Sequence, residues 1–417
     1  MILTKRQENI IAILTFLLFY CSIGYYCKNI LPEKINILIC TISISGIIGC
    51  SGAKFKVQTK MLYIFFCFSV LGLISSLFAG DSFTFVLYPI INLFLAMLYA
   101  ANVPIELFKK IYIRIVTIIS FISILCGILY YIVPSLFQLF PVTVNTAGNG
   151  VYNLLLLVMP VSGNFRLQGF AWEAGVFQLL INFSLLFLIT DNNWTRQNKR
   201  RLVILAVALV LTFSTTGYIV GLINVLLFLM RNYNGSVSHI KKVFLAIICI
   251  IILLYLVIPF IPTTINGVSF GLAKIQRFLQ GVSTSTNMDS ASVRFDSIYY
   301  PMKLFFQHPF IGAGYRGINS LGEIMHHTMT TCTIVNYFAM YGGLYGLLII
   351  ATFWKFAKRL TIHSMTAFLI LAELLLLSFS EQLVNYLIID ILLFLSVSLK
   401  NKRLDGGEDR INEIINY

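Results

Sequence analysis

The sequence carries few charged residues for its length. Charged side chains make up 11% of the 417 residues, and acidic ones are the scarcer kind, with 16 Asp and Glu against 30 Lys and Arg. A soluble globular chain has about 25% charged residues, so the composition excludes an ordinary soluble fold. The eight cysteines include no C-x-x-C pair and no metal-ligand spacing. We therefore expect no metal site, no cofactor and no disulfide framework.

Long apolar runs take the place of charge. Hydrophobic residues make up 58% of the chain, and a helix needs about 20 mainly apolar residues to cross a bilayer. The sequence therefore predicts an all-α polytopic membrane protein with about twelve transmembrane helices. We expect these at residues 8–26, 35–52, 61–79, 83–101, 111–133, 173–190, 201–214, 217–230, 243–261, 333–353, 361–380 and 382–399.

The basic residues predict how these spans are oriented. Short cytoplasmic loops are enriched in Lys and Arg, and most of the basic residues here cluster in every second segment between spans. We therefore expect both termini in the cytoplasm. We interpret the net charge of +14 as a consequence of this topology. We expect no nucleic-acid partner, because proteins that bind nucleic acid concentrate their basic residues on one face.

This topology divides the chain into six parts. They are an N-terminal scaffold of five spans (1–133), an external loop (134–172), the central spans (173–261), a large external loop with the catalytic residues (262–332), the C-terminal spans (333–399) and a cytoplasmic tail (400–417). The two external loops hold six basic residues against the usual bias, namely Arg166, Lys274, Arg277, Arg294, Lys303 and Arg316. They are candidates for binding an anionic ligand; pairing with Asp289, Asp296 and Glu323 is the alternative.

The end of the first external loop places charges of both signs ahead of a span. Arg166 and Glu173 flank a glycine and an aromatic pair, and Gln178 and Asn182 continue a polar face at i, i+4 spacing. This pattern predicts a cation and a carboxylate at the mouth of a helix. The alternative is an Arg166–Glu173 ion pair with Trp172 in the aromatic belt of the membrane.

A Ser-Thr-Thr-Gly sequence at 214–217 separates two short apolar limbs. Each limb spans only about 20 Å at about 1.5 Å per residue, so the turn between them is expected below the outer surface. Non-helical backbone at that depth is tolerated only where protein or a water-filled cavity covers it. The turn is a candidate floor for an outward-facing cavity, and one long kinked helix is the alternative.

The large external loop contains an amphipathic stretch and a glycine-rich run. Apolar residues recur at three- and four-residue spacing around Pro301, which predicts a kinked helix at the membrane surface or packed on the bundle; they are Phe295, Ile298, Tyr299, Met302, Phe305 and Phe306. Residues 312–317 fit G-x-G-x-x-G without the strand and helix of a dinucleotide site. We expect a turn there, either structural or with amides that face a phosphate.

Three of these motifs, in this order, resemble the O-antigen polymerase and O-antigen ligase superfamily. They are Arg166-x-x-Gly169 followed by Glu173, the turn at 214–217, and the outer loop in which residues 290–294 lead to residues 308–314. The resemblance continues to Gly346 through the glycines that follow the loop. His326 and His327 lie about a turn further from those glycines than the family's histidine does.

The resemblance implies a multi-span glycosyltransferase of GT-C-like architecture, acting on the outer face of the bacterial inner membrane. It implies a polymerase that joins undecaprenyl-diphosphate-linked oligosaccharides without metal or nucleotide sugar, with the lipid bilayer and a chain-length regulator protein as partners. The diphosphate would be bound by basic residues, namely Arg166, Arg294, Arg316, Arg277 and Lys303. A guanidinium group can donate two parallel hydrogen bonds to phosphate oxygens. Glu173, or else His326 or His327, would accept the proton of the attacking hydroxyl.

Two other functions remain open from the sequence. An O-antigen ligase would transfer the glycan to a lipid A core, whereas the Glu173 motif is closer to the polymerase branch. A lipid-linked glycan flippase or transporter is the alternative of another class. Glu373 and Asp390 lie in the last two spans, where acids are often functional, but the two halves of the chain show no repeat.

Overall fold

The computed structural model describes residues 4–52, 57–144, 150–161, 164–191, 195–231, 264–265, 268–270, 290–324 and 330–398. Within these residues the chain is mostly helical, and five helices are long and apolar enough to cross a membrane: α3 (Glu33–Cys50), α4 (Thr59–Ala79), α5 (Phe83–Asn102), α6 (Ile105–Ile132) and α14 (Thr333–Leu360). Shorter apolar helices accompany them: α7 (Ala174–Ile189), α9 (Thr215–Met230) and α15 (Ser364–Ser380). The predicted polytopic membrane protein is confirmed at this level.

Four further helices overlap predicted spans, and α16 (Leu387–Leu395) is much shorter than the span predicted there. The first span is divided at Gly24 into α1 (Lys5–Ile23) and α2 (Tyr25–Asn29), and the seventh and twelfth correspond to α8 (Arg196–Leu211) and α16. The ninth predicted span, 243–261, lies outside the described residues. The limbs around residue 214 form two separate helices, α8 and α9, rather than one kinked helix.

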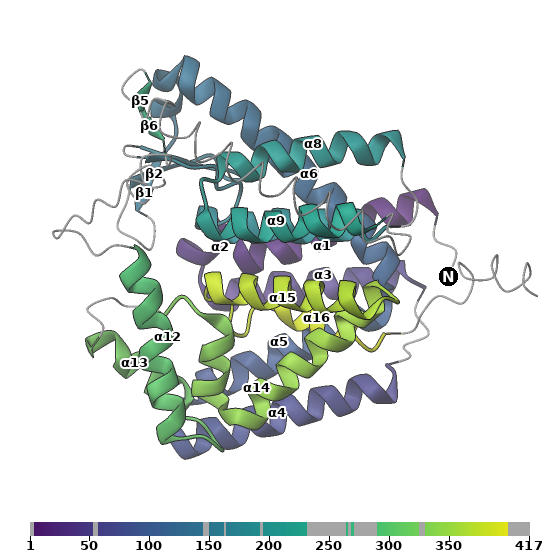
Figure 1. Ribbon diagram of the computed structural model, residues 1–417, viewed down its shortest axis with the longest axis vertical. Helices are drawn as coiled ribbons and strands as arrows, with labels where there is room; N and C mark the ends of the chain where they lie inside the picture. The colour runs from purple at the N-terminus through teal and green to yellow at the C-terminus, as the bar shows by residue number, and fades with distance from the viewer. Residues whose placement is uncertain are drawn as a thin grey trace, which may run out of the picture.

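The two predicted external segments meet at one end of the helix bundle. Figure 1 shows the N-terminus at the opposite end, and the strands together with α12 (Ser290–Gln307) and α13 (Gly314–Ile324) at this one. On α12, Phe305 packs edge-on against Phe338 of α14, with ring centroids 5.4 Å apart. Phe295, Ile298, Tyr299 and Phe306 of the same helix are exposed. The helix therefore both packs on the bundle and presents apolar side chains outward.

Short strands occupy the first external segment, which departs from the all-α prediction. A 3-10 helix (Pro134–Leu139) leads into an antiparallel sheet of β1 (Val142–Val144), β2 (Gly150–Asn153) and β3 (Val158–Pro160). In a second sheet, β4 (Asn164–Phe165) pairs in parallel with β6 (Val268–Phe270), which is antiparallel to β5 (Thr264–Ile265). The second sheet joins the two external segments just ahead of Arg166.

Helix α7 lies at the centre of the bundle. All of its residues are buried, and it packs against α6, α8, α9 and α15. Its polar side chains bond one another: Asn182 Nδ2 donates to Gln178 Oε1 at 2.9 Å, and Asn224 Nδ2 of α9 donates to Asn182 Oδ1 at 3.3 Å. Because buried amides are stable only when they are hydrogen-bonded, this ladder fixes α9 against α7.

Candidate active site

The turn between α8 and α9 is the point on which the candidate site is built. Ser214 caps α9, its hydroxyl accepting from the Gly217 amide at 3.3 Å. The Leu167 amide donates to the Leu211 carbonyl at 2.9 Å, and Arg166 Nε donates to the Thr212 carbonyl at 3.1 Å. The end of the first external segment is thereby fastened to the turn.

Arg294 reaches the same turn from the second external segment. Its Nη1 donates to the Thr216 hydroxyl in the first turn of α9. The structure thus brings Arg166 and Arg294, which are far apart in sequence, to the two sides of one turn, where their partners Thr212 and Thr216 are four residues apart. Within the described residues, no carboxylate lies within ion-pair distance (4.0 Å) of either guanidinium. Both are half-buried, so two cations there lack a protein counter-ion within that distance.

Glu173 stands at the start of α7 as its N-cap residue, and its side chain is exposed. The expected alternative, an Arg166–Glu173 ion pair, is not present among the described contacts. Trp172 is buried against Tyr386, with ring centroids 5.3 Å apart, instead of lying in an exposed aromatic belt. The Glu173 carboxylate therefore stands at the mouth of α7.

A fourth charged residue, Glu381, joins this group and was not predicted from the sequence. It follows α15 directly, its side chain is only 6% exposed, and it interacts electrostatically with Glu173, Arg294 and Arg166. A Cβ atom placed on Gly175 would lie 1.7 Å from Glu381 Oε1, so the carboxylate fills the space that this glycine leaves at the start of α7. Burial, and then the Glu173 charge, raise the pKa of Glu381 well above its usual range, while the two arginines oppose the shift.

The Glu381 backbone is held on both sides. Its carbonyl accepts from the Thr333 amide at 3.2 Å and from the Thr333 hydroxyl, which in turn accepts from the Leu383 amide at 2.7 Å. Gln178 Nε2 of α7 donates to the hydroxyl of Ser380 at 3.3 Å. The available signal in the sequence was the polar triplet 380–382, at the junction of the predicted spans 361–380 and 382–399.

The glycine-rich run is a structural turn, and several of its amides donate to protein acceptors. The Ala313 amide donates to the Ala339 carbonyl at 2.8 Å, and the Tyr315 and Arg316 amides donate to the Asp81 carboxylate at 2.9 and 2.8 Å. Gly312 has a φ of +82°, and a Cβ there would meet the Met340 carbonyl oxygen at 2.2 Å. Of the two alternatives, the structural turn is the one that these contacts support, because protein acceptors use the amides of Ala313, Tyr315 and Arg316.

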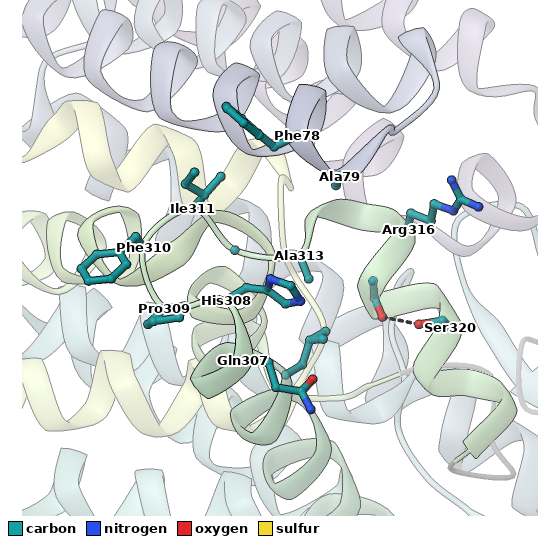
Figure 2. Close-up of a pocket in the computed structure, with 13 residues that line it drawn as sticks. Phe78, Ala79, Gln307, His308, Pro309, Phe310, Ile311, Ala313, Arg316 and Ser320 are labelled. Atoms are coloured by element: carbon teal, nitrogen blue, oxygen red, sulfur yellow. Dashed lines mark hydrogen bonds between the residues drawn. The ribbon is translucent and has the colours of Figure 1, made fainter.

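The other predicted ligand residues lie away from the turn between α8 and α9 or outside the described residues. Arg316 is exposed beside a pocket of about 660 Å³ between the ends of α4 and α12 (Figure 2). Lys303 is exposed on α12 and does not line that pocket. Arg277, His326 and His327, with Lys274, fall outside the residues that the structure describes.

The two intramembrane acids lie inside the bundle. Glu373 of α15 accepts from Asn224 Nδ2 at 2.8 Å, which places it at the far end of the α7 amide ladder. Asp390 of α16 is buried as well. Within the described residues neither forms an ion pair.

A comparison with protein-family models gives a match in the middle of this chain. Residues 202–331 match the model of the O-antigen ligase family. This confirms the resemblance over those residues. They include the turn between α8 and α9, Arg294 and Arg316, while Arg166, Glu173 and Glu381 lie outside the matched stretch.

The matched family has a known class of activity. Its members are ligases and polymerases of glycosyltransferase type in lipopolysaccharide and polysaccharide synthesis, and their substrates are lipid-linked glycans. A search among curated proteins finds no match to the chain.

Proposed function

We propose that this O-antigen ligase family protein is a polysaccharide polymerase of the bacterial inner membrane. It joins oligosaccharide repeat units carried on undecaprenyl diphosphate, at the outer face. The observation that supports this most is the meeting of Arg166 and Arg294 on one turn, beside Glu173 and Glu381. Among the described residues no carboxylate lies within 4.0 Å of either guanidinium group, and two such groups suit a diphosphate, which carries at least two negative charges.

The proposed chemistry is a single displacement at the anomeric carbon of the donor. The acceptor hydroxyl oxygen forms the new bond to that carbon, and the bond to the diphosphate oxygen breaks. The diphosphate leaves with the electron pair, and Arg166 and Arg294 stabilise the charge that develops on it. Glu173 takes the proton of the hydroxyl, because its carboxylate is exposed at the mouth of α7.

Neighbouring residues position these groups. Thr216 holds Arg294 by a hydrogen bond, and the Thr212 carbonyl holds Arg166. The buried Glu381 keeps its proton to higher pH than an exposed carboxyl does, because burial raises its pKa. At a given pH Glu381 thereby carries less negative charge beside the leaving diphosphate than an exposed carboxylate would.

A ligase is the second candidate, because the matched family model bears that description. The two activities share the donor and differ in the acceptor, which is another lipid-diphosphate glycan for a polymerase and a lipid A core for a ligase. Incubating the purified protein with the donor and each acceptor separates them. We expect longer lipid-linked glycans with the first acceptor and no glycan on the second.

The same assay separates an enzyme from a transporter. The protein in detergent, with a lipid-diphosphate glycan, a chelator, no proton gradient and no nucleotide sugar, should lengthen the glycan. Exchange of the substrate across a liposome bilayer without any change in its length would instead support transport and overturn the proposal.

Placing the site on the outer face rests on the proposed topology of about twelve spans with both termini in the cytoplasm. A single cysteine at Leu139, which is exposed in the 3-10 helix, should react with an impermeant maleimide in intact cells. A cysteine at Lys358, near the end of α14, should react only after permeabilisation. The reverse pattern would turn the site toward the cytoplasm.

A further inference from the structure

A second site lies at the other end of α12. The pocket there is bounded by Phe78 and Ala79 at the end of α4, by Gln307 and His308 at the end of α12, and by Arg316 on α13. Figure 2 shows His308 in its middle, with Arg316 on one side and Phe310 on the other. Because α4 is a candidate membrane span that ends at Ala79, the pocket lies at the level where lipid headgroups begin.

The lining combines a cation with an apolar rim. Phe78 and Phe310 are 76% and 86% exposed, which is unusual for side chains of this size unless lipid or a ligand covers them. Arg316 forms no ion pair within the described residues. The nearby Asp81 carboxylate is used by the two backbone amides at the start of α13. A charged headgroup beside a lipid tail complements this arrangement.

Helix α12 separates this pocket from the turn that holds Arg166 and Arg294. Arg294 lies near the start of the helix and Gln307 at its end, and at about 1.5 Å per residue this stretch spans about 20 Å. Figure 1 shows α12 running across the end of the bundle, from beside the strands to the end of α4. The two groups of residues are therefore distinct sites joined by one helix.

Given the proposed polymerase, the chemistry requires two such sites. The donor's diphosphate is attached to the reacting carbon and must lie within the catalytic group. The acceptor attacks with a hydroxyl at the far end of its oligosaccharide, so its own diphosphate stays intact and lies one repeat unit away. We propose that the pocket of His308 and Arg316 binds the diphosphate of the acceptor, and that α12 sets its distance from the donor's diphosphate. This rests on the proposed function.

Counting bound lipids tests the two sites without any turnover. Native mass spectrometry of the full chain in detergent with undecaprenyl diphosphate should show two molecules on the wild type, and one on each of Arg316→Gln and Arg294→Gln. Lys60→Gln, an exposed cation at the opposite end of α4 from the pocket, is the matched control and should retain two. A single molecule on the wild type, or displacement from the Arg316 site by phosphatidylglycerol at equal concentration, would overturn the proposal.

Kinetics then show which substrate the pocket serves. One substrate lacks its acceptor hydroxyl and can only donate; the other is joined to its lipid through a carbon–phosphonate bond and can only accept. Arg316→Gln should raise the KM for the acceptor by about 10- to 100-fold, the loss expected for a charge-assisted hydrogen bond, and leave the KM for the donor unchanged. With an acceptor glycan that lacks the lipid diphosphate, Arg316→Gln and the wild type should have the same KM for the acceptor.

The two proposals fail in different ways. If the wild type transfers glycan and Arg316→Gln raises the KM for the donor, or for neither substrate, the assignment of the pocket is wrong and the polymerase stands. If the wild type transfers nothing between the two lipid-linked substrates, the polymerase is wrong, and with it the role of the pocket as an acceptor site.

Discussion

Helices α4 and α7 both touch the candidate sites, yet they have opposite surroundings. In α4 the buried residues are Met61, Phe68, Ser75 and Ser76, and the rest of the helix is largely exposed apolar surface. In α7 every residue is buried, including Gln178 and Asn182. Both read as apolar spans in the sequence. The comparison shows that hydropathy identifies helices that enter a membrane without distinguishing those that face lipid from those that organise a site.

The difference lies in what the polar residues do. The polar side chains of α7 form hydrogen bonds with one another and with side chains of α9 and α15. A helix that is enclosed by protein can therefore carry side-chain amides that would be unsatisfied in lipid. On α4 the Ser75 hydroxyl donates to the Met340 carbonyl on the buried side. The following predictions compare matched positions on the two helices.

The largest difference in activity is expected between Glu173, at the start of α7, and Asp81, just beyond the end of α4. Glu173→Gln at the start of α7 should lower glycan transfer by about 10²- to 10⁴-fold, because it removes the proton acceptor. Asp81→Asn, just beyond α4, removes only a charge that caps α13, and should cost about 1 kcal/mol of stability with transfer largely retained. Single-turnover transfer and thermal unfolding measure the two effects. Equal loss of transfer in both variants would remove the distinction.

Glycines on the two helices should also respond differently. Gly175→Ala places a methyl group where the Glu381 carboxylate lies, and displacing that group should lower turnover by about 10²-fold. Gly72→Ala on α4 meets nothing closer than Tyr341 Cε1 at 3.9 Å, so turnover should be unchanged and stability should rise by up to about 1 kcal/mol. Normal turnover in Gly175→Ala would show that the position of Glu381 does not matter.

The amide ladder predicts a smaller effect, on folding. Asn182→Leu leaves the Gln178 and Asn224 side chains short of a partner, which should lower the free energy of unfolding by about 1–3 kcal/mol. Cys67→Ala on the exposed side of α4 should change it by less than about 0.5 kcal/mol. Thermal unfolding in one detergent compares them. A stable Asn182→Leu protein would mean that packing alone holds α7.

The pH dependence of stability should be the smallest effect. A carboxyl whose pKa is raised by folding contributes fully below its ordinary pKa of about 4.3, and this contribution is lost as pH rises through the raised value. For Glu381 the shift comes first from burial and then from Glu173. Wild-type stability should therefore fall more from acid to alkaline pH than that of Glu381→Gln. Glu33→Gln, at an exposed position, should show the same pH dependence of stability as the wild type. Parallel profiles for the wild type and both variants would contradict the raised pKa of Glu381.

The sequence predicted the membrane class, most span positions and the residues that approach the turn between α8 and α9. Arg166 and Arg294 were recognisable because positive charge in external loops runs against the usual bias, and Glu173 because it stands with Arg166 ahead of a predicted span. Glu381 was missed, because one carboxylate between two apolar spans has no local pattern, and only the packing of α15 against α7 brings it to Gly175. The strands were missed for a similar reason, since β4 and β6 pair across about a hundred residues.

Arg316 illustrates the limit of grouping residues by charge alone. The external loops suggested one set of ligand residues, whereas the structure separates Arg316 from Arg294 by the length of α12. Sequence spacing gave no distance between Arg294 and Arg316, because that distance is set by helix α12 and by the turn at Gly312.

Arg294→Lys tests the central claim most directly, that two guanidinium groups on the turn hold the donor's diphosphate. Lysine keeps the charge and loses the planar pair of donors, so transfer from a lipid-diphosphate donor should fall by about 10- to 100-fold at unchanged protein level. Glycan transfer by this variant at the wild-type rate would show that Arg294 is a solvated surface charge and that the active site lies elsewhere.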